Sequence, residues 1–230
     1  MEEVVTILMT EFVTHDVKRF VLEKPKNYKF TPGQATEISI NKPEWKDERR
    51  PFTFTSLNKD KVLEFTIKGY PEHSGVTEQL HKLIPGDELI VRDPWGTINY
   101  KGSGVFIAGG AGVTPFIAIF RSLRERGDLS GNKLFFSNKT AQDVILEKEF
   151  REMFPEGDLV LTLTEEECCG YDDRYIDKEF LEEEIDDFSQ NFYVCGPPGM
   201  VRDMKKYLNE LGAEMDSVVF EGKSTRGANG

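Results

Sequence analysis

Residues 1–101 show a period-two pattern of hydrophobic and polar positions. Short runs of alternating or β-branched residues are separated by turns such as Thr31-Pro32-Gly33-Gln34 and Pro85-Gly86-Asp87. This pattern is typical of strands in an antiparallel β-barrel or sandwich. The expected strands are Val4–Met9, Arg19–Leu22, Thr36–Ile40, Phe52–Thr55, Val62–Lys68 and Glu88–Arg92, and one helix is expected over Val76–Leu83.

The rest of the chain alternates between apolar runs and amphipathic stretches. Strands that alternate with helices imply a parallel sheet covered on both faces. The expected strands are Val105–Ala108, Lys133–Ser137, Leu159–Thr164, Asn191–Cys195 and Ser217–Phe220, and the expected helices are Pro115–Arg126, Val144–Met153, Lys178–Phe188 and Gly199–Leu211.

The change of pattern predicts a two-domain fold, an N-terminal antiparallel β-barrel followed by a C-terminal α/β parallel-sheet domain. The turn-like segment Tyr100–Gly104 marks the boundary, which gives domains over 1–101 and 102–221. The polar, Gly-rich segment 222–230 is expected to be a flexible tail.

Composition narrows the range of functions. A formal net charge of −12 argues against a general nucleic-acid binder. Three cysteines cannot ligate an all-cysteine iron–sulfur cluster and give no disulfide framework, as expected of a cytoplasmic protein. The three scattered histidines match no metal-ligand spacing.

We expect neither a signal peptide nor membrane insertion. The acidic start, Met1-Glu2-Glu3, lacks the basic region of a secretory signal. The uncharged segment Gly104–Phe120 contains four glycines and a proline, so a buried strand, a turn and a helix start explain it better than a membrane span.

The segment Arg50–Ser56 offers a cation, aromatic rings and hydroxyls within a few residues. Arginine is suited to bidentate phosphate recognition, and an aromatic ring can stack on a flat heterocycle. Alternation would send Arg50, Phe52 and Phe54 to one face, so a twist is needed to bring Thr53 to the same ligand. An ordinary strand with aromatic core residues is the alternative.

Three later motifs suit a nucleotide ligand, the first two through its phosphates. Gly75 precedes the expected helix at Val76, where Ser74 or Thr77 could cap the helix or the backbone could bind a pyrophosphate. Gly109–Pro115 joins a strand to a helix, with Thr114 as the expected N-cap and Pro115 as the first helical residue. The acid of the dinucleotide fingerprint is missing, because the next strand ends in Ser137-Asn138-Lys139.

The third motif, Cys195–Met200, follows a parallel strand, where open α/β sheets bind ligands. The small sulfur of Cys195 could contact a nicotinamide ring, although a buried cysteine before a stiff turn is the alternative. Glu165-Glu166-Glu167 and Glu182-Glu183-Glu184 look like solvated segments, and Cys168-Cys169 looks like a bystander pair.

In this order the motifs resemble the ferredoxin–NADP reductase superfamily, particularly its cytochrome b5 reductase and flavohaemoglobin-reductase branches. The resemblance extends from Phe12 to Phe220. The motifs that carry it are Pro32-Gly33-Gln34, Arg50-Pro51-Phe52-Thr53, Gly75-Val76-Thr77, Pro85-Gly86-Asp87, Gly109–Pro115 and Cys195–Met200.

The resemblance implies an FAD-binding barrel and an NAD(P)-binding α/β domain. Arg50 would hold the flavin pyrophosphate, Phe52 would pack on the isoalloxazine where many relatives have Tyr, and Thr53 would lie near flavin N5. The expected cofactor-binding residues are Arg50, Pro51, Phe52, Thr53, Ile67, Lys68, Gly75, Val76, Thr77, Gly110, Ala111, Gly112, Val113, Thr114, Pro115, Asn138, Cys195, Gly196, Pro197, Met200 and Phe220, with Thr53 and Cys195 catalytic and no metal ligands.

The implied activity is hydride transfer from NAD(P)H to FAD, followed by electron transfer to a separate acceptor. Ferredoxin, flavodoxin, a cytochrome, an oxygenase component or a small molecule would serve. A non-catalytic subunit or interaction module that retains the reductase fold is the alternative. The motifs leave the choice between NADH and NADPH open, and whether Phe220 shields the flavin also stays open.

Overall fold

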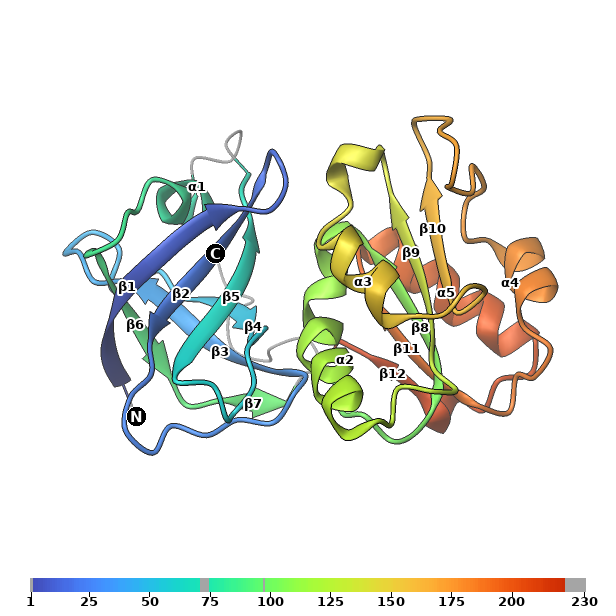
Figure 1. Cartoon of the computed structure of the whole chain (residues 1–230), viewed down its shortest axis with the longest axis horizontal. Helices are drawn as coiled ribbons and strands as arrows, with labels where there is room; N and C mark the ends of the chain where they lie inside the picture. Colours follow the sequence, from blue (N-terminus) through green and yellow to red (C-terminus); the bar gives the residue numbers. More distant parts are fainter. Residues whose placement is uncertain (1, 71–74, 97, 222–230) are drawn as a thin grey trace.

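The computed structural model describes residues 2–70, 75–96 and 98–221, which form two units side by side (Figure 1). The expected tail and the candidate capping residue Ser74 lie outside the described residues. None of the helices in these ranges is long and apolar enough to cross a membrane.

The N-terminal unit is a nearly closed antiparallel β-barrel. Its strands follow the order β4-β3-β6-β1-β2-β5, and β7 also pairs with β3. A bridge between Phe54 and Phe65 joins the two ends of this order, which confirms the barrel. The elements are β1 (Glu2–Phe12), β2 (Val17–Glu23), β3 (Gln34–Ile40), β4 (Arg50–Thr53), β5 (Val62–Lys68), α1 (Val76–His81), β6 (Glu88–Arg92) and β7 (Trp95–Gly96).

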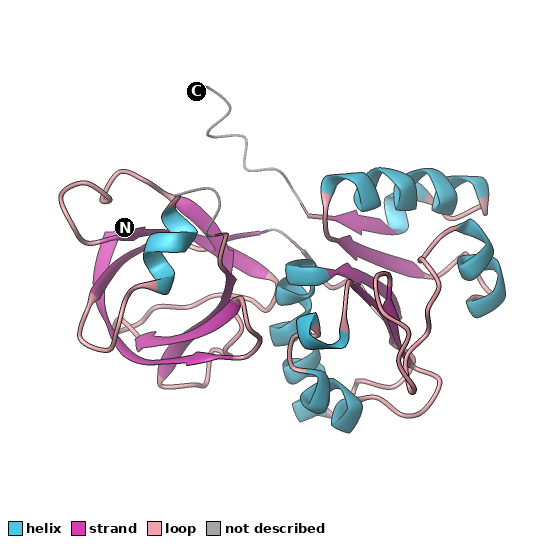
Figure 2. Ribbon diagram, turned by 90° about the horizontal axis from the view of Figure 1, so that it is seen from above, coloured by secondary structure: helices cyan, strands magenta, loops and turns pink. Residues whose placement is uncertain are grey.

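The C-terminal unit is a parallel sheet in the order β10-β9-β8-β11-β12. Helices α2 and α3 pack on one face and α4 and α5 on the other, as Figure 2 shows. Its strands are β8 (Gly104–Gly109), β9 (Lys133–Asn138), β10 (Leu159–Leu163), β11 (Asn191–Cys195) and β12 (Val218–Phe220). Its helices are η2 (Gly110–Val113), α2 (Thr114–Arg126), η3 (Ala141–Asp143), α3 (Glu147–Met153), α4 (Lys178–Glu184), α5 (Pro198–Glu210) and η4 (Met215–Ser217).

The phenylalanines at and after the end of β4 are not buried as the expected alternation predicts. The strand ends at Thr53, and Phe54 is fully buried, stacked on Phe30 at 4.0 Å between ring centroids. Phe52 only partly packs against the barrel core. The prediction that Phe54 shares a ligand-facing side with Arg50 and Phe52 is therefore wrong, because barrel closure draws Phe54 inside.

Two helices begin later or end earlier than their periodicity predicts. Helix α3 starts at Glu147 rather than Val144, because Leu146 adopts a positive φ of 53°. Thr140 and Asp143 instead form a capping box on the short turn before it. Helix α4 ends at Glu184 rather than Phe188.

The two units are joined by a part-buried ion network around Arg121 of α2. Its guanidinium donates to the Thr55 carbonyl and the Glu64 carboxylate of the barrel, each at 2.7 Å. It also donates to both oxygens of Glu149 on α3, at 2.6 and 2.8 Å. Nearer the surface, Lys59 pairs with Glu125. Burial disfavours the charge on Arg121, but the two carboxylates outweigh burial and raise its pKa.

Acid is expected to weaken the barrel through His81. Its Nε2–H donates to the Ile67 carbonyl at 2.8 Å, and burial lowers the pKa of the ring from its ordinary 6.5. Because the unfolded chain accepts the proton first, stability should fall as pH drops from 6.5 towards the lowered pKa, by up to about 1.4 kcal/mol per pH unit.

The measurement is urea unfolding at pH 7.5 and pH 5.5, in the wild type and His81→Gln. Glutamine keeps a donor but does not titrate, so the variant should lose less stability between the two pH values. An equal loss in both proteins would contradict this role for His81.

Candidate functional site

A cavity of about 1120 Å³ lies at the carboxyl edge of the parallel sheet. Its walls come from the turn after β8, the ends of β9 and β10, and the start of α5. Lys68 and Tyr70 of the barrel also line it. The cavity is therefore built mainly by the C-terminal unit, and the end of barrel strand β5 borders it.

The floor of the cavity is a close contact between two turns. A Cβ on Gly112 would lie 2.3 Å from the Cys195 carbonyl oxygen and 2.6 Å from the Gly196 Cα. A Cβ on Gly109 would lie 2.5 Å from the Met200 sulfur and 2.8 Å from the Pro197 Cδ. Glycine is needed at Gly112 because backbone meets backbone there, and at Gly109 because the Met200 and Pro197 side chains fill the space beside it. The bare turns leave room for a ligand above.

The electrostatics of this floor favour an anion. Thr114 at the start of α2 and Pro198 at the start of α5 both line the cavity. Helix N-termini present free N–H groups and the positive end of the helix dipole. The arrangement suits a pyrophosphate.

Helix α2 begins differently from the prediction. Its N-cap is Val113, which is buried, and Thr114 is the first helical residue, with Pro115 second. The Thr114 hydroxyl donates to the Ala111 carbonyl at 2.9 Å. The N-cap assignment of Thr114 is therefore wrong, because the turn Gly110–Val113 is itself a 3₁₀-helix that leads directly into α2.

Cys195 is 2 % exposed and its thiol donates to Glu221 at 3.2 Å. Burial raises the thiol pKa, and the Glu221 charge and hydrogen bond raise it further. The thiol is thus kept protonated, which rules out thiolate chemistry at ordinary pH. A neutral sulfur at the cavity wall suits contact with a ring.

Asn138 ends β9 at the far side of the cavity. Asn138 is only 5 % exposed, and neither the nitrogen nor the oxygen of its side-chain amide has a hydrogen-bond partner among the described residues. Such an orphaned amide is costly unless a ligand satisfies it. Asn138 therefore fits the role of a nucleotide contact.

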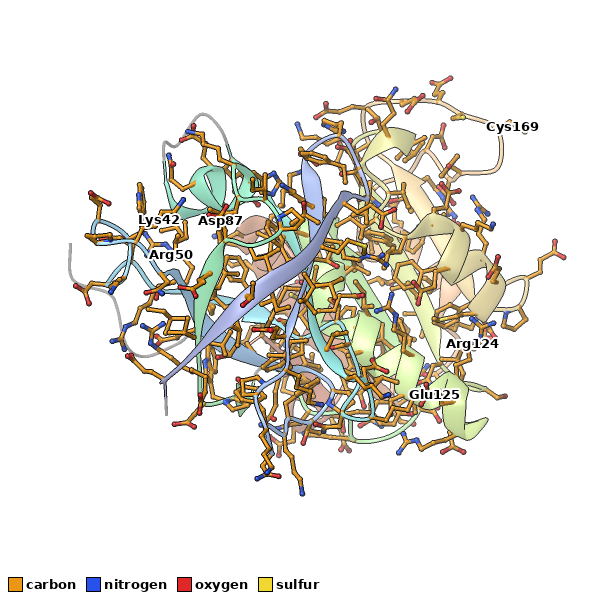
Figure 3. The ribbon with its side chains drawn as sticks, turned by 60° about the vertical axis from the view of Figure 1, so that its left-hand side comes forward. Lys42, Arg50, Asp87, Arg124, Glu125 and Cys169 are labelled. Carbon is orange, nitrogen blue, oxygen red and sulfur yellow. The ribbon has the colours of Figure 1, made fainter. Side chains whose placement is uncertain are left out.

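The barrel residues of the candidate flavin site lie on β4. Arg50 is exposed and its guanidinium contacts only the Arg49 carbonyl at 2.8 Å and the exposed Glu48 at 3.4 Å among described residues. Figure 3 labels Arg50 on the barrel. Pro51 is exposed, whereas Thr53 is buried and its hydroxyl has no hydrogen bond in the described part of the chain. An exposed cation whose partners are local and a hydroxyl without a partner suit a flavin nucleotide.

The second group of candidate flavin residues lies on β5 and α1. Lys68 lines the cavity and pairs with Asp16 at 2.8 Å, but the Ile67 and Val76 side chains are buried in the barrel core. Only their backbones can reach a ligand. Gly75 is the N-cap of α1, and Thr77 is the second residue of the helix. The alternative in which Thr77 caps the helix is therefore wrong.

The remaining candidate cofactor-binding residues belong to the C-terminal unit. The cavity is lined by Gly110, Ala111, Gly112, Thr114, Asn138, Cys195, Gly196, Pro197 and Met200. Phe220 is not among the lining residues; it pairs with Val194 in the sheet and the Lys205 ammonium lies 5.9 Å from its ring centroid.

Sequence reasoning missed Glu221, Tyr70 and Tyr175, which line the cavity. Glu221 could have been found: β11 and β12 are parallel neighbours, and the residue after Phe220 falls beside the one after Val194. Tyr70 and Tyr175 come from loops, for which the hydrophobic pattern gives no signal.

Family comparison agrees with this division of the chain. Residues 5–100 match the "Oxidoreductase FAD-binding domain" family and residues 106–206 match the "Oxidoreductase NAD-binding domain" family. An NADH-cytochrome b5 reductase 1 of Kluyveromyces lactis is 31% identical over 220 residues, which covers 88% of this chain and 77% of that protein. The chain belongs to the ferredoxin–NADP reductase superfamily.

Solved structures show the same fold in other members of the superfamily. The flavohem-like FAD/NAD-binding domain of the nitric oxide dioxygenase from Vibrio cholerae superposes with a TM-score of 0.84 at 21% identity, over 95% of this chain and 97% of that one. A ferredoxin NADP+ reductase from Neisseria gonorrhoeae, solved with bound FAD and NADP, gives 0.79 at 19% identity, over 96% and 98%.

Membership of this superfamily confirms the expected enzyme class. The chain is an FAD-dependent NAD(P)H oxidoreductase that passes electrons to a partner. The unpartnered Asn138 amide and the glycines between the two turns fit a dinucleotide, and the exposed Arg50 guanidinium and the Thr53 hydroxyl fit FAD.

Proposed function

We propose that this reductase uses the cavity to hold NAD(P)H against an FAD carried by the barrel. Within this proposal, residues 1–101 form the FAD-binding domain and 102–221 the NAD(P)-binding domain. The ends of the two family matches, at 100 and 106, support that division. When bound, the two cofactors supply hydride transfer from the nicotinamide to the flavin.

The observation that carries the proposal is that the glycine turn at Gly112 and the protonated thiol of Cys195 lie next to each other in the wall of one cavity. Gly112 packs against the backbone of Cys195, so the pyrophosphate-binding turn and the thiol are fixed relative to each other. Glu221 holds the thiol by its hydrogen bond. The residues thus align a ring and its phosphates without acting as a base or a nucleophile.

The barrel residues would hold the flavin. Arg50 would bind its pyrophosphate together with the backbone of Gly75–Thr77, Phe52 would pack on its ring, and the Thr53 hydroxyl would hydrogen-bond near N5. The exposure of Arg50 and the unpartnered Thr53 hydroxyl support these roles. The acceptor would be a separate cytochrome, ferredoxin, flavodoxin or oxygenase component, or a small molecule; the similarity to an NADH-cytochrome b5 reductase supports the first of these.

Removing either group that faces the reacting rings is expected to slow flavin reduction. Thr53→Ala deletes a hydrogen bond and Cys195→Ala deletes a ring contact, so each should lower the stopped-flow reduction rate by about 5- to 100-fold through lost bonding and alignment. Thermal stability should change much less.

Two controls separate chemistry from folding. Thr53→Ser keeps the hydroxyl and should retain most of the rate, and Cys168→Ala makes the same substitution at an exposed thiol outside the cavity. Wild-type reduction rates in both Thr53→Ala and Cys195→Ala would overturn the assignment of these two residues.

A further inference from the structure

The loops that follow β9 and β10 lie side by side at the carboxyl edge of the sheet. The two strands are parallel and pair Asn138 with Leu163. Pairing continues past their ends: the Thr164 N–H donates to the Asn138 carbonyl at 2.9 Å, and the Glu165 N–H donates to the Lys139 carbonyl at 2.8 Å. The register therefore fixes Glu165 opposite Lys139.

Their side chains also pair. The Lys139 ammonium lies 2.8 Å from a Glu165 carboxylate oxygen, and this hydrogen bond raises the pKa of Lys139. One residue further along, the Glu166 carboxylate accepts from the Ala141 N–H at 2.7 Å. The acidic run after β10 is thus attached to the end of β9 and is not merely a solvated segment.

This edge is the part of the cavity left for the adenosine end of a dinucleotide. The phosphates belong at the glycine floor and the nicotinamide at Cys195, on the other strands. In doubly wound folds the ribose 2′ position is recognised at the end of the second strand, here β9 with its orphaned Asn138.

Positive charge is scarce there. Among the described residues that line the cavity, the cationic side chains are Lys68 and Lys139. Lys68 is paired with Asp16 at 2.8 Å, and Lys139 with Glu165. Asp143 adds a further carboxylate to the lining at this edge.

We propose that the enzyme prefers NADH to NADPH, and that Glu165 is the residue that enforces the preference by occupying Lys139. This inference rests on the proposed function of the cavity. A 2′-phosphate carries a charge of about −1.5 to −2 and needs a free Lys or Arg. Here the phosphate would meet Lys139, a charged lysine that is already paired with the Glu165 carboxylate. A 2′-hydroxyl can instead hydrogen-bond to Asn138 or to a carboxylate.

Binding of nucleotide fragments to the FAD-loaded protein tests the proposal without turnover. The probes are AMP and adenosine 2′,5′-bisphosphate, with Kd measured by isothermal titration calorimetry. The wild type should bind AMP at least as tightly. In Glu165→Gln the freed Lys139 should improve the relative affinity for the bisphosphate by about tenfold, a gain of one charge-assisted hydrogen bond.

Three further variants locate the effect. Glu165→Gln combined with Lys139→Gln should lose the gain, because the phosphate then has no cation. Glu167→Gln removes the same charge from the same loop at a residue that, unlike Glu165, makes no ion pair with Lys139 among the described residues, and it should shift the ratio far less. Glu165→Ala repeats the main test with a different side chain.

Kinetics provide the second readout. The ratio of kcat/KM for NADPH to that for NADH should rise in Glu165→Gln by a similar factor. A wild type that prefers NADPH, or a ratio unchanged in both Glu165 variants, would overturn the inference while leaving the reductase function intact. A protein that binds neither fragment and is reduced by neither nucleotide would instead refute the proposed function itself.

Discussion

Replacing Arg121 with methionine is expected to lower the free energy of unfolding by about 2–3 kcal/mol, somewhat less than the loss of one member of a fully buried ion pair, because the network is part-buried. Methionine fills most of the volume but leaves the Glu64 and Glu149 carboxylates without their shared cation. Their side chains are only 13% and 24% exposed, so water compensates little. Urea unfolding at pH 7 measures the loss.

The matched control is Arg124→Met on the same helix. Arg124 is exposed, at the solvent side of α2 beside Glu125 (Figure 3), so its replacement should change stability by less than about 0.5 kcal/mol. Equal effects of the two substitutions would show that the network does not stabilise the contact between the units.

Gly112→Ala is expected to lower the rate of flavin reduction by NAD(P)H by about 100-fold, the effect of a misplacement of roughly 1 Å at a reacting centre. The new Cβ would fall 2.3 Å from the Cys195 carbonyl oxygen and 2.5 Å from its carbon. Both are backbone atoms, so the turn that carries Cys195 must move. FAD, held by the barrel, should stay bound.

Gly127→Ala provides the comparison, since Gly127 at the end of α2 lies outside the cavity, its Cβ meets nothing within 4 Å and the cost is the backbone strain of a φ of +74°. That variant should lose about 1–2 kcal/mol of stability and keep most of the reduction rate. Stopped-flow reduction of both FAD-loaded variants decides the matter. A Gly112→Ala enzyme as fast as Gly127→Ala would show that the contact between the two turns is unimportant.

Sequence pattern predicts the fold wherever local preference and burial agree. The bounds of β5, β6 and β11 follow directly from their apolar runs. The start of α3 does not, because the hydrophobic periodicity runs on through residues 144–146, whereas Leu146 has a positive φ of 53° that interrupts the helix. In the same way, closure of the barrel buries Phe54, although a single strand would place it beside Phe52.

The site divides along similar lines. The glycine turns and Cys195 are visible as motifs because each is continuous in sequence. Glu165 is not visible, because its partner Lys139 lies 26 positions earlier and meets it only through the parallel register of β9 and β10. Glu221 is similarly recognised only through its hydrogen bond with the Cys195 thiol, at the end of the neighbouring strand. Contacts between side chains at the ends of neighbouring strands thus become visible only when the strands are paired.

The most direct test of the central claim is an anaerobic titration of the purified, FAD-loaded protein with NADH and, separately, with NADPH. The barrel and cavity assignments predict a yellow protein whose flavin absorption bands bleach on addition of the nucleotide and return when an electron acceptor is added. A protein that takes up no FAD, or whose bound flavin keeps its oxidised spectrum under saturating amounts of both nucleotides, would contradict the account.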